Sequence, residues 1–225
     1  LTTIQSSVEL LEHYHNKLSL EKQLTHFNRI SISVERMHHM LNEILLISEA
    51  EAGKLNFNPA PINLIKFCLT LVEELEQNGN NQNVVKEINP ENRIIFTVEG
   101  KIVNADYRPF IDEKLLRQIL TNLLSNALKY SDAGSTVQFD LKCLEDKVIF
   151  RIQDQGIGIP KADQIYLFDS FYRASNSGTI QGTGLGLAIV KQCVDLHHGE
   201  IAINSIEGVG TTFTVTLPLK CHSAP

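Results

Sequence analysis

One stretch near the middle of the chain, residues 115–130, carries polar side chains that helical spacing brings to one face. They are Asn122, Asn126, Lys129 and Tyr130. Amide oxygens suit a hard cation such as Mg²⁺, an ammonium group suits phosphate, and a phenol ring can cover a base. An amphipathic helix with ordinary polar residues at its solvent edge would show the same pattern. The stretch indicates chemistry only if other segments support it.

An aspartate and two glycines follow a predicted strand, in the order Asp154-Gln155-Gly156-Ile157-Gly158-Ile159-Pro160. The glycines allow a flat ligand to approach the backbone, and the Asp154 carboxylate can accept a hydrogen bond from an exocyclic amine. Such an acceptor would select adenine over guanine. A glycine turn with a capping aspartate is the alternative interpretation.

A second glycine-rich segment, Gly182-Thr183-Gly184-Leu185-Gly186-Leu187, leads into a predicted helix. Free backbone amides at a helix N-terminus bind phosphate. The glycine spacing is not that of the dinucleotide-binding fingerprint, and the P-loop sequence GxxxxGK(S/T) is absent.

Aromatic residues lie between the two glycine segments, in the order Phe168-Asp169-Ser170-Phe171-Tyr172-Arg173. These aromatic residues could dock a lid over a ligand, and Arg173 could reach a terminal phosphate. The alternative is a small apolar cluster beside a solvated arginine.

Taken in this order, the four segments resemble the N, G1, F and G2 boxes of sensor histidine kinases. In this chain they read Asn-Leu-Leu-Ser-Asn-Ala-Leu-Lys-Tyr, Asp-Gln-Gly-Ile-Gly, Phe-Asp-Ser-Phe-Tyr-Arg and Gly-Thr-Gly-Leu-Gly-Leu. These kinases are members of an ATPase superfamily that includes gyrase and Hsp90. The resemblance covers nearly the whole chain and implies ATP and Mg²⁺ as cofactors.

The resemblance implies a role for each matching residue. Asn126 would be the Mg²⁺ ligand, with Asn122 near the metal and its waters. Lys129 and Arg173 would contact phosphate, and Tyr130 would lie beside the nucleotide. These residues include the catalytic set that the resemblance implies: Asn122, Asn126, Lys129 and Arg173.

The same resemblance implies further nucleotide contacts. Asp154 would bind the adenine amino group, and Thr211, which comes after Gly208-Val209-Gly210, would be another base contact. Gly182, Gly184 and Gly186 would shape the phosphate-facing end of the lid. The remaining positions are Gly156, Gly158, Ile159, Thr183 and Leu185.

Residues 1–53 predict two helices, at about 1–17 and 21–52, joined in an antiparallel hairpin. The second helix has an apolar stripe at heptad spacing: Phe27, Ile30, Val34, Met37, Leu41, Ile44 and Ser48. Because one hairpin cannot cover such a seam, we expect a homodimer through residues 1–52 that forms a four-helix bundle. Packing of the hairpin on the rest of the chain is the alternative. The hairpin resembles the family's dimerisation and histidine-phosphotransfer domain.

The rest of the chain divides into a linker at 54–62, a catalytic ATP-binding domain at 63–220 and a tail at 221–225. Its expected helices are residues 63–77, a helix from Asp112 to Tyr130, and residues 185–197. Its expected strands are residues 93–98, 101–106, 136–143, 147–154, 200–205 and 211–217. This order predicts an α+β fold, with an antiparallel sheet and helices on one face.

The composition is that of a soluble globular protein. A net charge of −6 argues against a broad nucleic-acid surface, and no apolar run approaches the ~18 residues of a membrane span. The 4 cysteines show no CxxC spacing, so we expect them to be reduced and structural. These features predict a cytoplasmic protein with no nucleic-acid partner and no membrane contact in this part, although its parent protein could be membrane-anchored.

The predicted activity is that of an ATP-dependent protein-histidine kinase of a two-component system. Its γ-phosphoryl group would pass to a bundle histidine and then to an aspartate on a response-regulator receiver domain. The family's acceptor box, His-Glu/Asp-x-x-x-Pro, matches none of the hairpin histidines: His13, His15, His26, His38 and His39. The opening residues, Leu-Thr-Thr-Ile-Gln, resemble those that come directly after the proline of that box in the family. We therefore expect the acceptor just upstream of Leu1.

Two alternatives come from other classes of protein. A gyrase- or Hsp90-like clamp ATPase needs a base to activate water, and the amide of Asn122 cannot take a proton. A non-catalytic dimeric nucleotide-binding scaffold would not need the complete set of polar site residues.

Overall fold

A computed structural model of the chain describes residues 2–14, 17–80, 93–100, 108–132, 134–178, 180 and 182–219. The chain divides into two compact units, residues 1–49 and residues 50–225. Within the described ranges, no helix combines the length and the apolar character that crossing a membrane requires.

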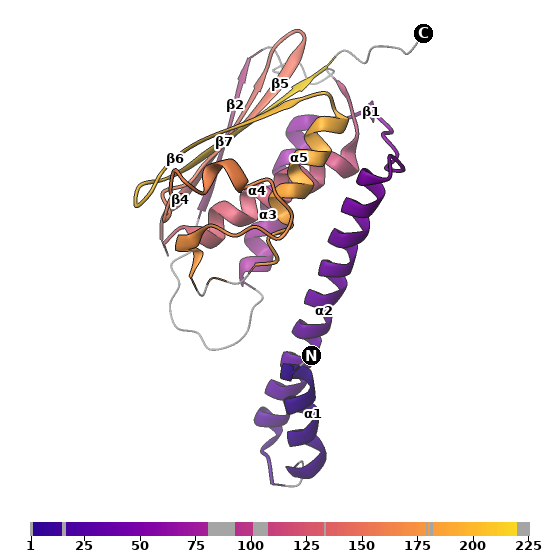
Figure 1. Cartoon of the computed structure of the whole chain (residues 1–225), viewed down its shortest axis with the longest axis vertical. Helices are drawn as coiled ribbons and strands as arrows, with labels where there is room; N and C mark the ends of the chain where they lie inside the picture. Colours follow the sequence, from indigo (N-terminus) through magenta and orange to yellow (C-terminus); the bar gives the residue numbers. More distant parts are fainter. Residues whose placement is uncertain are drawn as a thin grey trace. The chain divides into compact units, whose positions relative to one another are not determined.

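Two helices make up the N-terminal unit: α1 (Thr2–Tyr14) and α2 (Leu20–Glu51). Both lie close to the bounds that the heptad pattern predicts. Ser7 of α1 faces His26 of α2, with 3.5 Å between Oγ and Nδ1. Because a short connection joins the helices, this contact makes them antiparallel neighbours, which Figure 1 shows. The chain therefore forms the predicted hairpin.

Much of the apolar surface of the hairpin is exposed. The side chains of Phe27, Leu41 and Leu45 are exposed to 57%, 59% and 59%. Other large apolar residues on the two helices are exposed as well: Val8, Leu10, Tyr14, Leu20, Leu24, Val34, Met40 and Ile44. The predicted apolar seam is therefore largely uncovered within one copy of the chain.

A five-stranded sheet in the order β2-β4-β5-β7-β6 forms the centre of the described C-terminal unit. Its strands are β2 (Arg93–Gly100), β4 (Thr136–Cys143), β5 (Lys147–Gln153), β6 (Glu200–Ile206) and β7 (Gly210–Pro218). The prediction of a wholly antiparallel sheet is wrong, because β2 pairs with β4 in parallel. A helix lies between these two strands in the sequence, and such a crossover returns the chain in the same direction. The strand predicted at 101–106 lies outside the described residues.

Three helices cover one face of the sheet (Figure 1). They are α3 (Leu64–Asn80), α4 (Glu113–Tyr130) and α5 (Gly186–Leu196). The side chains of Leu116, Leu120 and Leu124 on α4 are fully buried, as their spacing predicts. Alternate residues of β5 point into the same core. The predicted α+β class is therefore confirmed.

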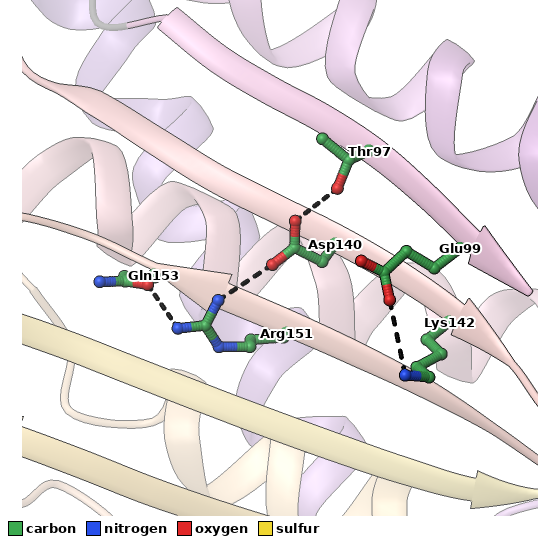
Figure 2. Close-up of polar contacts among 6 residues, drawn as sticks. All are labelled: Thr97, Glu99, Asp140, Lys142, Arg151 and Gln153. Atoms are coloured by element: carbon green, nitrogen blue, oxygen red, sulfur yellow. Dashed lines mark hydrogen bonds and ion pairs between the residues drawn. The ribbon is translucent and has the colours of Figure 1, made fainter.

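The opposite face of the sheet carries polar pairs that join neighbouring strands (Figure 2). Asp140 of β4 accepts a hydrogen bond from Thr97 of β2 and pairs with Arg151 of β5, whose Nη1 lies 3.1 Å from Oδ2. Lys142 of β4 lies 3.5 Å from Glu99 of β2. Each pair joins residues directly opposite one another, so these contacts stabilise the parallel edge strand.

The segment that comes after α2, predicted as part of the linker, belongs to the C-terminal unit in the structure. Its two-residue strand β1 (Ala60–Pro61) pairs antiparallel with β3 (Phe110–Ile111). The amide of Asn58 donates to Asp112 Oδ2 at 2.7 Å, while Asp112 Oδ1 accepts from the Leu115 amide at 3.1 Å. One buried carboxylate thus caps α4 and holds this segment.

Candidate functional site

The C-terminal half of α4 lies against the glycine-rich segment that leads into α5. A Cβ atom added at Gly186 would lie 2.7 Å from Asn122 Oδ1, and one added at Gly182 would lie 2.8 Å from Lys129 Nζ. Carbon atoms do not approach polar atoms this closely, so the absence of side chains permits the contact. Two segments that carry separate motifs in the sequence therefore meet.

Lys129 and Tyr130 form a local pair at the end of α4. The Lys129 ammonium donates to Tyr130 Oη at 3.2 Å and lies 4.6 Å from the centre of the ring. Asn126 lies one turn earlier on the same helix and is half-buried. An ammonium, a phenol and an amide thus line the same end of the helix.

The same end of α4 contacts the first glycine motif. The carbonyl oxygen of Tyr130 accepts from the Ile157 amide at 3.1 Å. A Cβ atom added at Gly156 would lie 2.2 Å from that oxygen. The glycine is required here because a backbone atom, which cannot rotate away, occupies the space.

Asp154 is buried directly after the last residue of β5. Its Oδ1 accepts from the amides of Gly156 and Thr211 at 2.9 Å and 3.1 Å. Burial raises the pKa of this carboxyl, and the two amide hydrogen bonds oppose that shift. Because both of these bonds end on Oδ1, they fix the direction of the carboxylate while Oδ2 keeps its acceptor capacity for a ligand amine.

A serine that motif spacing does not identify connects the first motif to the β6–β7 hairpin. Ser205 Oγ accepts from the Ile159 amide at 2.9 Å and lies 2.9 Å from Thr211 Oγ1. Gly158 adopts φ +61°, and a Cβ atom there would lie 2.0 Å from the carbonyl oxygen of Ile206. Ile159 and Thr211, both predicted to contact the nucleotide, therefore share one hydroxyl.

The lid, residues 168–184, is joined near its two ends by a backbone contact. The Phe171 amide donates to the Gly184 carbonyl at 2.9 Å, and both residues have positive φ, 66° and 76°. The Phe171 side chain is 66% exposed, so the alternative of a small apolar cluster containing this ring is wrong. The Leu185 amide donates to Thr183 Oγ1 and the Leu185 side chain is buried, so that side chain belongs to the core.

Arg173 contacts its own segment in this structure. Its Nη2 donates to Ser177 Oγ at 3.3 Å, to the Gly178 carbonyl at 3.5 Å and to the Ile180 carbonyl. These acceptors lie within the lid, so the structure does not bring Arg173 into the group formed by Asn122 and Lys129.

Two other residues that motif spacing misses hold the lid. Asp163, which precedes the lid, accepts hydrogen bonds from Tyr172 and Ser175. Asn176 donates from Nδ2 to the Gly158 carbonyl at 2.9 Å. Short motifs do not identify either residue, because each contact links positions at least nine residues apart.

This set of residues fits an adenine nucleotide with a hard cation. It combines a carboxylate beside glycine backbone, an ammonium, a phenol and two amide side chains. No group of three His, Cys, Asp or Glu in the described ranges could hold a metal ion by itself. A cation here would therefore take amide oxygens from the protein, and phosphate oxygens and waters would complete its shell, as is usual for Mg²⁺.

Comparison with known proteins distinguishes a histidine kinase from the gyrase- and Hsp90-like ATPases. Residues 111–221 match the family of histidine kinase-, DNA gyrase B- and HSP90-like ATPases. The sensor histidine kinase WalK of Bacillus subtilis is 37% identical over 190 residues, which cover 83% of this chain. This chain contains a sensor histidine kinase catalytic domain. The matched residues include Asn122, Asp154 and Gly186, so the family assignment falls on the site just described.

Two solved structures share the fold of the chain. ShkA, solved in complex with AMPPNP, matches 100% of this chain and 47% of its own, with a TM-score of 0.69 and 20% identity. ThkA, solved in complex with the response regulator TrrA, matches 99% of this chain and 59% of its own, with a TM-score of 0.67 and 18% identity. The chain spans 29% of the length of WalK, so the catalytic domain is one part of such relatives.

Proposed function

We propose that the chain is the ATP-binding and phosphotransfer part of a protein-histidine kinase in a two-component system. The observation that carries the proposal is the convergence of the two glycine-rich segments on the C-terminal half of α4, through three contacts: Asn122 meets Gly186, Lys129 meets Gly182, and the Tyr130 carbonyl meets Gly156. Asp154 supplies the base-selective acceptor beside them. The ATPase family match supports ATP as the nucleotide.

In this proposal the residues of the site bind and orient ATP. The Asp154 carboxylate accepts from the adenine amino group, and Lys129 neutralises phosphate charge. Asn126 would hold Mg²⁺, which would offset the charge that develops on the phosphate oxygens. Phosphoryl transfer requires mainly positioning and charge neutralisation from the protein, so no covalent enzyme intermediate is needed.

Asn122 separates this activity from ATP hydrolysis by a clamp. Its Nδ2 donates to the Gln118 carbonyl at 2.9 Å, which fixes the amide with its oxygen toward Gly186. An amide cannot remove a proton from water, so hydrolysis is slow and a histidine nitrogen is the better nucleophile. That histidine lies in an acceptor box upstream of Leu1 in our proposal.

The second copy of the chain is proposed to cover the exposed stripe of α1 and α2. Phe27, Val34 and Leu41 repeat at heptad spacing and are exposed to 57%, 49% and 59%. Two such hairpins would bury the stripe in a four-helix bundle, which would make the protein a homodimer. A response-regulator receiver domain would then take the phosphoryl group from the bundle, in a cytoplasmic setting.

A nucleotide titration tests the proposal. The wild-type chain should bind ATP more tightly than GTP, and added Mg²⁺ should strengthen ATP binding. Asp154→Asn should weaken ATP binding by about 10- to 100-fold, as expected for a lost hydrogen bond to a charged group. GTP should lose less, because the new amide can donate to the guanine oxygen. Equal ATP affinity in the wild-type chain and Asp154→Asn would show that Asp154 does not contact the adenine base.

A further inference from the structure

Asp163 is a buried carboxylate that accepts hydrogen bonds only from lid residues among its described partners. Its Oδ1 accepts from Tyr172 Oη at 2.8 Å. Its Oδ2 accepts from the Ser175 amide at 2.7 Å and from Ser175 Oγ at 2.8 Å. The side chain precedes the lid, directly before the short 3₁₀ helix Gln164–Tyr166. One carboxylate therefore joins the segment after the first glycine motif to the lid.

The partners of Asp163 lie on both sides of Arg173. Tyr172 directly precedes the arginine and Ser175 comes two positions after it. Because the Ser175 contact includes a backbone amide, it restrains the main chain and not merely a rotatable side chain. The backbone that carries Arg173 is thus held from both directions.

Two further contacts make this part of the lid one unit. The Tyr172 ring packs against the Tyr166 ring, with 5.5 Å between their centres. The guanidinium of Arg173 binds Ser177 Oγ and the Gly178 carbonyl on the same segment. Movement of the Asp163 anchor would therefore move Arg173 together with its surroundings.

The chemistry of the three donors requires a charged acceptor. They hold the pKa of the Asp163 carboxyl below its ordinary value, chiefly through the Ser175 amide, and Asp163 in turn raises the pKa of Tyr172. The tyrosine therefore stays a phenol that donates, and the aspartate stays a carboxylate that accepts on both oxygens. An asparagine in place of Asp163 could accept from Tyr172 or from Ser175 but not from both, because its NH₂ group would face a donor.

We propose that Asp163 is a positioning residue that sets the place of Arg173 relative to the terminal phosphate of ATP. The proposal rests on the proposed function, with Arg173 taking the phosphate-contact role that the resemblance of the four motifs implies; its hydrogen bonds in the structure lie within the lid. It adds a residue outside the four motifs whose effect on ATP would pass entirely through another side chain.

The test measures ATP and ADP affinity together with the thermal midpoint for the complete chain and its variants. Arg173→Ala and Asp163→Asn should each weaken ATP binding by about tenfold and ADP binding by about twofold or less. The thermal midpoint of Asp163→Asn should fall, because its NH₂ group would face a donor, so the affinities are compared at a temperature at which both proteins are folded. Asp146→Asn, which removes the same charge from the exposed β4–β5 turn, is the matched control and should change neither affinity.

A double variant shows whether Asp163 acts through Arg173. If it does, Asp163→Asn should weaken ATP binding no further in the Arg173→Ala background. Additive losses would overturn the proposal, and so would equal losses of ATP and ADP affinity. Tyr172→Phe and Ser175→Ala, which each remove part of the anchor, should reduce the preference for ATP over ADP by smaller factors. Unchanged preference in both would also contradict it.

The outcomes separate this inference from the proposed function. A wild-type chain that binds no ATP would refute the proposed function itself. ATP binding that depends on Asp154 but not on Arg173 or Asp163 would leave the proposed function in place and overturn only the positioning role.

Discussion

At the scale of single residues, Asp154 combines a cost in stability with a role in recognition. Two backbone amides orient its carboxylate, and burial raises its pKa because the charged form loses solvation by water. This combination accords with our proposal that Asp154 binds the adenine amino group, because an uncharged side chain would cost the fold less.

Asp154→Asn should therefore raise the thermal midpoint at neutral pH while it weakens ATP binding. The folded-state pKa lies above the unfolded value, so wild-type stability declines as the pH rises through the folded-state pKa. Asparagine does not titrate, and the gain over wild type should be larger at about pH 7 than at about pH 4. Calorimetry of both proteins at the two pH values measures the difference. A variant less stable than wild type at both would contradict this account.

At the scale of elements, the spacing of apolar residues predicted the helices but not the pairing of the strands. The spacing of Leu116, Leu120 and Leu124 predicted α4 because a helix repeats its buried face every three to four residues. The parallel pairing of β2 with β4 was missed, since strand partners are chosen by a crossover and not by alternation within either strand.

The same distinction holds for the candidate site. Motif spacing identified Asn122, Lys129 and Asp154, because each lies in a short segment with its own chemistry. It missed Asp163 and Ser205, whose partners lie 12 and 46 residues away along the chain. Their roles arise only when the folded chain brings distant segments together.

Asp112 should contribute more to stability than an ordinary helix cap. Asp112→Ala removes the cap of α4 and leaves the Asn58 amide without its carboxylate acceptor, which should lower the free energy of unfolding by about 2–4 kcal/mol. Asn63→Ala is the control, because Asn63 only caps α3 by accepting from the Lys66 amide at 3.0 Å. It should cost about 1 kcal/mol in the same denaturant titration. Equal losses would show that the second contact of Asp112 contributes nothing.

At the scale of the whole molecule, the two units present different surfaces. The core of the C-terminal unit lies between the sheet and three helices, and the polar pairs in Figure 2 lie on the other face of the sheet. The hairpin instead leaves Phe27, Leu41 and Leu45 exposed. In our proposal a second copy of the hairpin covers this apolar surface.

A Met37→Glu, Leu41→Glu double variant should convert the protein from dimer to monomer. Leu41 is 59% exposed in one copy, so a charge there leaves the hairpin intact but becomes unpaired and buried in the bundle. Asn42→Glu adds one such charge at the exposed position next to Leu41 and should stay dimeric. Light scattering measures the mass of each protein. A dimeric double variant, or a monomeric wild type, would refute the bundle.

The most direct test of the whole account is the fate of the γ-phosphoryl group. The chain, extended by the residues that precede Leu1 in its gene, is incubated with γ-labelled ATP and Mg²⁺. We expect an acid-labile, base-stable adduct typical of phosphohistidine, which Asn126→Ala should abolish and which the 225-residue chain alone should not form. Rapid release of free phosphate with no adduct would contradict the account and indicate a clamp ATPase instead.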